Sequence, residues 1–171
     1  MFERILVGFD GSSHAHRAVQ VASTIAGRFQ SKLTIVVVRP PIPLRGEEVA
    51  RLEALVPMSA DGRSLATLFE DFREHAMANG ARAVESVTLH GDVLDSLLGY
   101  LGQNPQDLVV VGSRGLTPGR RFLLGSVSSG LVNSARCPVL VVHPGPTPAE
   151  GTGTPSVGNP SGPPASRVPT P

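Results

Sequence analysis

The alternation of buried strands and amphipathic helices constrains the fold of this chain more than any other feature of its sequence. Four short apolar runs, rich in β-branched residues, lack the polar alternation of a half-exposed strand and are typical of strands buried on both faces. They span residues 5–7, 33–38, 108–111 and Val139–Val142. A fifth run, residues 83–89, mixes polar and apolar side chains, which predicts a strand at the edge of the sheet.

Segments with helical spacing separate these runs. The first starts at Ser12 and Ser13, carries apolar residues at steps of three and four, and has Gly27 close to its end. Three more are expected over residues 64–78, from Asp92 to residue 101, and from Ser126 onward. The alternation predicts one α/β domain over residues 1–143, with a single open five-stranded parallel sheet and helices on both faces. The expected strand order is 3-2-1-4-5.

Two stretches fall outside this pattern. Residues 39–61 are rich in proline and too long for a plain connection, so we expect a surface excursion with one helical turn. Residues 144–171 are dominated by Pro, Gly, Ser and Thr and cannot bury enough apolar surface to become ordered. We interpret them as a disordered tail. The alternative, a ligand for an SH3-type domain, has weak support because Pro-x-x-Pro spacing with basic neighbours is poorly developed.

Charge and composition restrict the classes of partner. A net charge of +1 and a single lysine, Lys32, provide no basic field of the kind that drives nucleic-acid binding. One cysteine, Cys137, excludes an intramolecular disulfide and a cysteine-based zinc site. The apolar run after Glu3 and Arg4 is too short for a signal peptide or a membrane span, so we expect a cytoplasmic protein without a membrane partner.

Two strands are followed by glycine-rich segments, GFDGS at residues 8–12 and GSRG at residues 112–115. In an open parallel sheet, ligands bind beyond the carboxyl ends of the strands where the strand order reverses. Glycine there lets the main chain approach a ligand, and a carboxylate such as Asp10 can accept hydrogen bonds from ribose hydroxyls. The pair of segments therefore suggests a nucleoside site, provided that the two strands are neighbours.

The start of the fourth helix suggests an anion site. Gly125-Ser126-Val127-Ser128 brings free main-chain N–H groups, the positive end of a helix dipole and serine hydroxyls together, which suits phosphate. Arg114, Arg120 and Arg121 either add positive charge there or are solvated surface residues. The structural alternative is that the glycines only form turns and that Ser126 only caps the helix.

These residues also carry a resemblance. The segment VVGSRGLTPGRRFLLGSVSSG, residues 110–130, resembles the signature of the ATP-binding branch of the universal stress protein family. That pattern is Gly, two residues, Gly, nine residues, then Gly followed by Ser or Thr, and Gly112, Gly115, Gly125 and Ser126 fit it without a gap. The opening RILVGFDGS and the closing ARCPVLVVH are similar to the first and last strands of the family.

The resemblance implies a set of binding residues. Asp10 would hold the ribose and the main chain of Val38 would meet the adenine edge, while Gly8 stands where the family has alanine, proline or glycine. The phosphates would be lined by Gly112, Ser113, Gly115, Gly125, Ser126, Val127 and Ser128. The implied ligand is ATP, with or without Mg²⁺; AMP and a cyclic nucleotide remain alternatives.

Three functional classes stay open. The resemblance favours a regulatory module whose ATP occupancy alters its assembly or its contacts with an unidentified protein. The second class is a slow ATP hydrolase or transferase, although no carboxylate or histidine is evident in the phosphate loop and no catalytic residue is assigned. In the third class, ATP only stabilises an assembly subunit. Motifs of dinucleotide-binding proteins, Walker-type ATPases and nucleophile-elbow hydrolases are absent from the sequence.

Two further features concern assembly and metals. The unbroken apolar run Val139–Val142 is predicted at a sheet edge, which invites pairing, and the resemblance also implies a homodimer through this strand. The alternative is that the tail folds back over this edge. His14 and His16 are two residues apart at a helix start, so they are expected on different helix faces, as surface residues and not as metal ligands.

Overall fold

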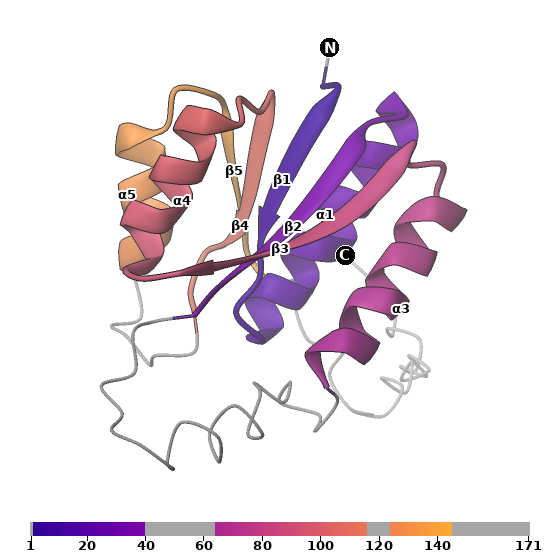
Figure 1. Ribbon diagram of the computed structural model, residues 1–171, viewed down its shortest axis with the longest axis horizontal. Helices are drawn as coiled ribbons and strands as arrows, with labels where there is room; N and C mark the ends of the chain where they lie inside the picture. The colour runs from indigo at the N-terminus through magenta and orange to yellow at the C-terminus, as the bar shows by residue number, and fades with distance from the viewer. Residues whose placement is uncertain (1, 40–63, 116–123, 145–171) are drawn as a thin grey trace, which may run out of the picture.

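The computed structural model describes residues 2–39, 64–115 and 124–144, in which strands and helices alternate as predicted (Figure 1). The elements are β1 (Arg4–Gly8), α1 (Ser13–Phe29), β2 (Lys32–Arg39), α3 (Leu65–Ala78), β3 (Ala83–His90), α4 (Val93–Gln103), β4 (Leu108–Gly112), α5 (Ser126–Ser134) and β5 (Val139–Val142). The helical turn expected within residues 39–61, the segment 116–123 and the tail from residue 145 lie outside the described residues. Arg39, expected in the excursion, is the last residue of β2.

The five strands form one all-parallel sheet in the order β3-β2-β1-β4-β5, which confirms the predicted order. The mixed-polarity strand β3 lies at one edge and β5 at the other. Because β1 is central and pairs with both β2 and β4, all three of its middle residues are buried.

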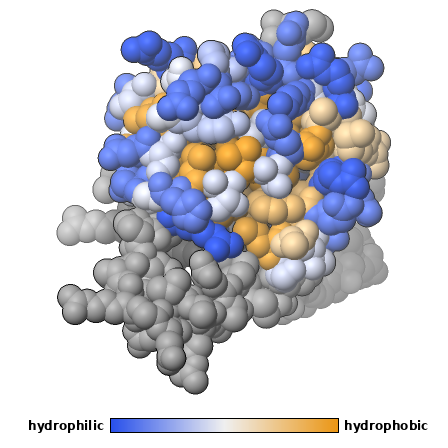
Figure 2. Space-filling view, in the orientation of Figure 1, coloured by the Kyte–Doolittle hydropathy of each residue, from blue (hydrophilic) through white to orange (hydrophobic). Residues whose placement is uncertain are grey.

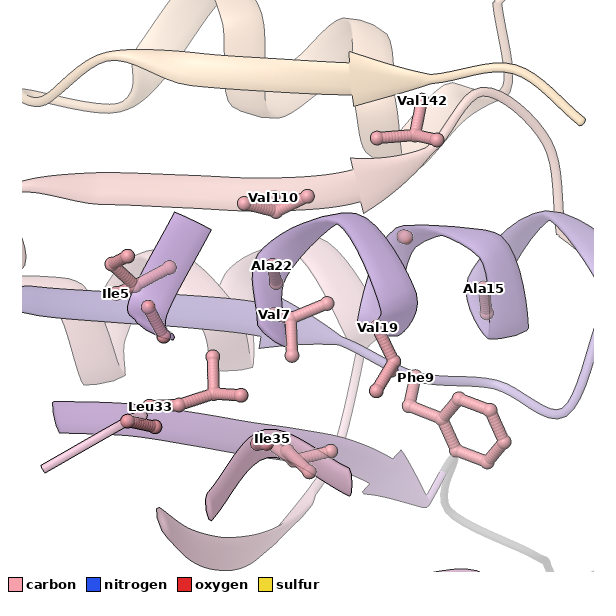
Figure 3. Close-up of a cluster of buried hydrophobic side chains, with 14 of the residues drawn as sticks. Ile5, Val7, Phe9, Ala15, Val19, Ala22, Leu33, Ile35, Val110 and Val142 are labelled. Atoms are coloured by element: carbon pink, nitrogen blue, oxygen red, sulfur yellow. The ribbon is translucent and has the colours of Figure 1, made fainter. Parts of the chain in front are cut away.

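Helices cover both faces of the sheet, with α1 and α3 on one side and α4 and α5 on the other (Figure 1). Side chains of a strand alternate between faces, so Ile5 and Val7 join the core under α1 while Leu6 joins the core under α4 and α5. Figure 3 shows Val7 beside Val19 and Ala22 of α1. Small side chains on α1 let the helix lie close to the sheet.

The polarity of β3 agrees with its edge position. Val84 packs partly buried under α3, whereas Val87 and Leu89 are partly buried on the α4 side. Figure 2, in the orientation of Figure 1, shows apolar surface at the centre of this view with hydrophilic residues around it. Along β3, Ser86 and Thr88 alternate with Val87 and Leu89 and are exposed, which accounts for the mixed sequence of the strand.

Side chains cap three of the helices. Ser12 and Ser64 open α1 and α3, and Asp92 opens α4; each side chain accepts a hydrogen bond from a main-chain N–H of the first turn. These caps fall where the sequence predicted the helices to start. None of the helices in the described segments is long and apolar enough to cross a membrane.

Gly27 lies close to the end of α1, as predicted, and also has a packing role. Helix α1 continues past it to Phe29, and Gln30, with φ of 53°, ends the helix in the left-handed conformation. A β-carbon on Gly27 would overlap the main-chain carbonyl of Asn79, the C-cap of α3. Glycine at this position therefore allows α1 to approach the end of α3.

Candidate nucleotide-binding site

The two glycine-rich segments meet at the carboxyl end of the sheet. β1 and β4 are neighbours, paired from Ile5↔Leu108 to Val7↔Val110. The chain leaves β1 for α1 on one face, while α5, which follows β4, lies on the other face. Diverging connections of this kind open a crevice where parallel sheets bind ligands. The condition placed on the nucleoside site, that these strands are neighbours, is thus met.

Asp10 lies in this crevice against the other loop. Its Oδ1 accepts a hydrogen bond from the N–H of Ser12 at 3.0 Å. A β-carbon added to Gly115 would lie 2.6 Å from its Oδ2, so the Asp10 carboxylate stands directly over the α-carbon of Gly115. Gly11 turns the chain between Asp10 and Ser12 with φ of 86°, a conformation suited to glycine.

Two of the predicted site glycines have packing reasons for their identity. A β-carbon on Gly112 would lie 2.8 Å from the β-carbon of His14 and 2.9 Å from its carbonyl carbon, so the first turn of α1 packs on Gly112. A β-carbon on Gly8 would be 3.3 Å from Cγ1 of Val111, a tight contact. The close packing at both positions favours a residue without a side chain, irrespective of any ligand.

Ser113 connects three parts of the structure. Its N–H donates to the carbonyl oxygen of Val142 at 2.8 Å, and its own carbonyl oxygen accepts from the N–H of Gly125 at 2.8 Å. The Oγ of Ser128 is also 3.3 Å from that carbonyl oxygen. The hydroxyl of Ser113 is buried, with 2% of the residue exposed, and has no hydrogen-bond partner among the described residues.

Helix α5 starts differently from the other three helices of the described segments. Its N-cap is Gly125, which provides no side-chain hydrogen bond. The first main-chain bond of the helix joins the N–H of Ser129 to the Gly125 carbonyl, so the N–H groups of Ser126, Val127 and Ser128 precede it. Ser126 is thus the first helical residue and not the cap, contrary to the structural alternative.

Val38 lies at the end of β2, next to β1. The ladder between these strands ends at the Gly8↔Val36 pair, after which the N–H of Phe9 donates to the carbonyl of Val36. The carbonyl of Arg39 bonds on the opposite side, to the N–H of Gly91 beyond β3. Main-chain groups of successive residues in a parallel strand face alternate neighbours, so those of Val38 face the space beyond the end of β1.

The two histidines differ from each other in the structure. The His16 ring packs edge-on against Phe9 and Phe72, with ring centroids 5.0 and 5.5 Å away, so it joins α1 to α3 and is not the surface residue that was predicted. His14 lies at the start of α1, against Gly112. Nothing in the local sequence signalled this contact, because it depends on α1 crossing β4.

The arginines that the sequence left open between a phosphate role and a surface role are described only in part. Arg114 is half-buried beside Ser113, whereas Arg120 and Arg121 lie outside the described residues. Over the described segments, no group of three or more His, Cys, Asp or Glu side chains is placed to hold a metal ion. Among the described residues, the predicted site brings together main-chain N–H groups, serine hydroxyls and the carboxylate of Asp10.

Comparison with known proteins identifies relatives over the whole predicted domain. The model of the universal stress protein family matches residues 1–143. A universal stress protein of Thermus aquaticus is 34% identical over 144 residues, covering 84% of this chain and 100% of that protein. One of Mycobacterium tuberculosis is 33% identical over 145 residues, covering 83% of this chain and 97% of its own length.

Solved structures agree with this assignment. A universal stress protein in complex with cAMP is 29% identical, with a TM-score of 0.65 over 84% of this chain and 99% of that one. The UspA protein of Lactobacillus plantarum, 23% identical with a TM-score of 0.69 over 83% of this chain and 99% of its own, has the same fold. By sequence match and by architecture, this chain belongs to the universal stress protein family.

Proposed function

We propose that this protein binds ATP across the carboxyl ends of β1 and β4 and acts as a nucleotide-dependent regulatory module. The observation that carries the proposal is the start of α5, which lacks a side-chain cap and lies beside Ser113, whose buried hydroxyl has no partner among the described residues. Helix N-terminal N–H groups and a buried hydroxyl donor are satisfied by an acceptor, and a phosphate supplies several.

The phosphate end is formed by two segments that are hydrogen-bonded to each other. Gly112, Ser113 and Gly115 form one of them and Gly125 to Ser128 the other, and the Ser113 carbonyl joins them through the N–H of Gly125. Because this carbonyl is already paired, the N–H groups of α5 are the groups left to face an anion. Any Mg²⁺ would be brought by the nucleotide phosphates.

The nucleoside end lies along β1 and β2. The Asp10 carboxylate is held by the N–H of Ser12 in a position to accept from ribose hydroxyls, and the main chain of Val38 is directed toward the adenine edge. The universal stress protein that is 29% identical to this chain was solved with cAMP, which supports an adenine nucleotide as the class of ligand.

A regulatory role follows from the position of Ser113. The residue proposed to meet the phosphates also donates its N–H to Val142 at the end of β5. β5 is an edge strand whose residues 139–141 are only half-buried, and we propose that it pairs with a second copy in a homodimer. Light scattering at micromolar concentration tests the homodimer; a monomer contradicts it.

The nucleotide proposal is tested by identifying the ligand and blocking its site. The mass of any nucleotide released on denaturing freshly purified protein is measured, and ATP is titrated into the wild type and Gly125→Val. The Gly125 backbone, with φ of −60° and ψ of 158°, accepts valine, and an added β-carbon has ordinary contacts, 3.5 Å or more. The variant should fold and lose ATP binding.

Gly99→Val is the matched control, because Gly99 is exposed on α4 and an added β-carbon would meet nothing within 4 Å. This variant should bind ATP like the wild type. If the wild type neither carries nor binds an adenine nucleotide, the proposal is wrong and the glycines are purely structural. If Gly125→Val binds as well as the wild type, the phosphates lie elsewhere.

A further inference from the structure

The three glycines of the family signature have different surroundings in this chain. Gly112 backs onto the first turn of α1, and Gly125 has ordinary contacts with Ser113, Arg114 and Ser128. Gly115 differs from both because it faces Asp10, the carboxylate proposed to hold the ribose. The described atoms within 4 Å of a β-carbon on Gly115 all belong to Asp10, Oδ2 at 2.6 Å and Cγ at 3.8 Å.

The two carboxylate oxygens of Asp10 lie against different loops. Oδ1 accepts from the N–H of Ser12, at the N-cap of α1, while Oδ2 lies over the α-carbon of Gly115. Oδ1 is therefore tied to the loop after β1, and the position of Oδ2 depends on the loop after β4. The hydrogen atom that replaces a side chain at residue 115 provides the space that Oδ2 occupies.

We propose that Gly115 is a positioning residue for the ribose-binding carboxylate and not a phosphate contact. This inference rests on the proposed function, because it requires that Asp10 meets a ribose. A methyl group at residue 115 would collide with the end of a flexible side chain and with no described main-chain atom. Gly115→Ala should therefore fold normally but displace the Asp10 carboxylate from its position over the loop.

Comparing two nucleotides distinguishes the loss of the Asp10 contact with the ribose from the loss of a contact with the phosphates. ATP and 2′,3′-dideoxy-ATP carry the same triphosphate and base, but only ATP has ribose hydroxyls that Asp10 can accept from. Hydrogen bonds to charged groups are worth enough that losing them weakens binding by about tenfold or more. The wild type should thus prefer ATP over the dideoxy nucleotide by about that factor.

Isothermal titration of both nucleotides into wild type, Gly115→Ala and Gly125→Val forms the test. In Gly115→Ala we expect affinity for ATP to fall to that for dideoxy-ATP, with the dideoxy affinity unchanged. In Gly125→Val, the phosphate-side control, both affinities should fall together. Combining Gly115→Ala with Asp10→Ala should bring no loss beyond that of Asp10→Ala alone, because the two residues act as one unit.

The outcomes distinguish this inference from the proposed function. If Gly115→Ala weakens both nucleotides equally, Gly115 contacts the phosphates and the inference is overturned while ATP binding stands. The inference is also overturned if Gly115→Ala binds ATP as the wild type does, or if the wild type does not distinguish the two nucleotides. If the wild type binds neither nucleotide, the proposed function itself fails and the inference fails with it.

Discussion

The two ends of the parallel sheet differ in whether their polar groups are hydrogen-bonded among the described residues. At the amino end, side chains pair with the main chain: Oδ2 of Asp107 accepts from the N–H groups of Glu3 and Arg4 at 2.9 and 2.8 Å, and the Ser31 hydroxyl donates to the carbonyl of Phe2. At the carboxyl end, α5 begins at an uncapped glycine and the buried hydroxyl of Ser113 has no described partner.

This difference distinguishes polar groups that stabilise the fold from polar groups that are available to bind a ligand. Polar groups that are paired within the chain stabilise the fold, whereas buried polar groups left unpaired are destabilising unless a ligand or water satisfies them. The contrast also exists among helices at the carboxyl end, because α1 is capped by Ser12 while α5 is not capped by a side chain. Substitutions at the amino end should change stability alone, and those at α5 should change binding.

The largest expected effect comes from giving α5 the cap that it lacks. Gly125→Asp places a carboxylate on the first-turn N–H groups, and the backbone angles of residue 125 accept it. The carboxylate would occupy the proposed phosphate position and repel the nucleotide, so ATP affinity should fall on the order of a hundredfold. The midpoint of thermal unfolding should stay the same or rise slightly.

Gly125→Asn is the matched variant for this change, because it caps the helix without adding charge. Its ATP affinity should lie between those of the wild type and Gly125→Asp in a calorimetric titration. If Gly125→Asp binds ATP like the wild type, the start of α5 is not the phosphate site, and the contrast between the two ends of the sheet has no functional meaning.

Asp107→Ala should give the next largest effect, at the opposite end. It removes the acceptor for two main-chain N–H groups at the start of β1, which should lower the free energy of unfolding by about 1–2 kcal/mol. Urea denaturation measures this change, and ATP titration should show unchanged affinity. A clear loss of ATP affinity in a folded variant would show that the two ends are not independent.

Ser12→Ala tests the capped helix at the carboxyl end. The Ser12 hydroxyl accepts from the N–H of Ala15 at 3.1 Å, and losing this cap should lower the free energy of unfolding by about 1 kcal/mol. The N–H of residue 12 still donates to Asp10, so ATP affinity should persist. Should affinity fall as strongly as in Gly125→Asp, the start of α1 would belong to the anion site as well.

The smallest effect expected is a pH dependence from Asp107. Hydrogen bonds from the N–H of Arg4 and then of Glu3 outweigh partial burial and hold the pKa of the Asp107 carboxyl below its ordinary value. A carboxyl with a lower pKa in the folded state stabilises the protein at neutral pH, and this contribution is lost as the pH falls below about 5.

Comparing the wild type with Asp107→Asn isolates this contribution. Glu85, whose pKa is lowered by hydrogen bonds from Lys32 and Thr34 that outweigh its burial, contributes acid sensitivity to both proteins and cancels from the difference. The gap in unfolding free energy between the two proteins should narrow from about pH 7 to about pH 3.5. If the difference in unfolding free energy stays constant with pH, the charge of Asp107 does not contribute to stability.

Much of the fold was predictable because it depends on short-range patterns. Apolar runs without alternation identified four members of the five-stranded sheet, β1, β2, β4 and β5, and the mixed run at residues 83–89 identified the edge strand β3, although β5 is an edge strand too. The caps Ser12 and Asp92 marked helix starts because their side chains bond within their own first turns. Such signals can be read locally, since the interacting residues are a few positions apart.

The site was predictable only as a set of segments. The family signature and the strand order brought Asp10 near the glycine loop, but the contacts of each residue came from the tertiary structure. That Gly112 supports α1, that Gly115 faces Asp10 and that His16 packs between Phe9 and Phe72 all involve partners far apart in the chain. A sequence shows that a glycine is needed, but not which neighbour requires it.

The sequence by itself indicated the parallel sheet, because hydrophobic periodicity and turn residues act over a few positions and leave few topologies. It indicated the family through the spacing of the glycine signature. Only the tertiary structure decided which polar groups are paired and which are left open. Pairing depends on distances between main-chain groups of different elements, such as Ser113 with Gly125 and Val142. Those distances are set when the helices pack on the sheet, and they leave the start of α5 open at one end of the molecule.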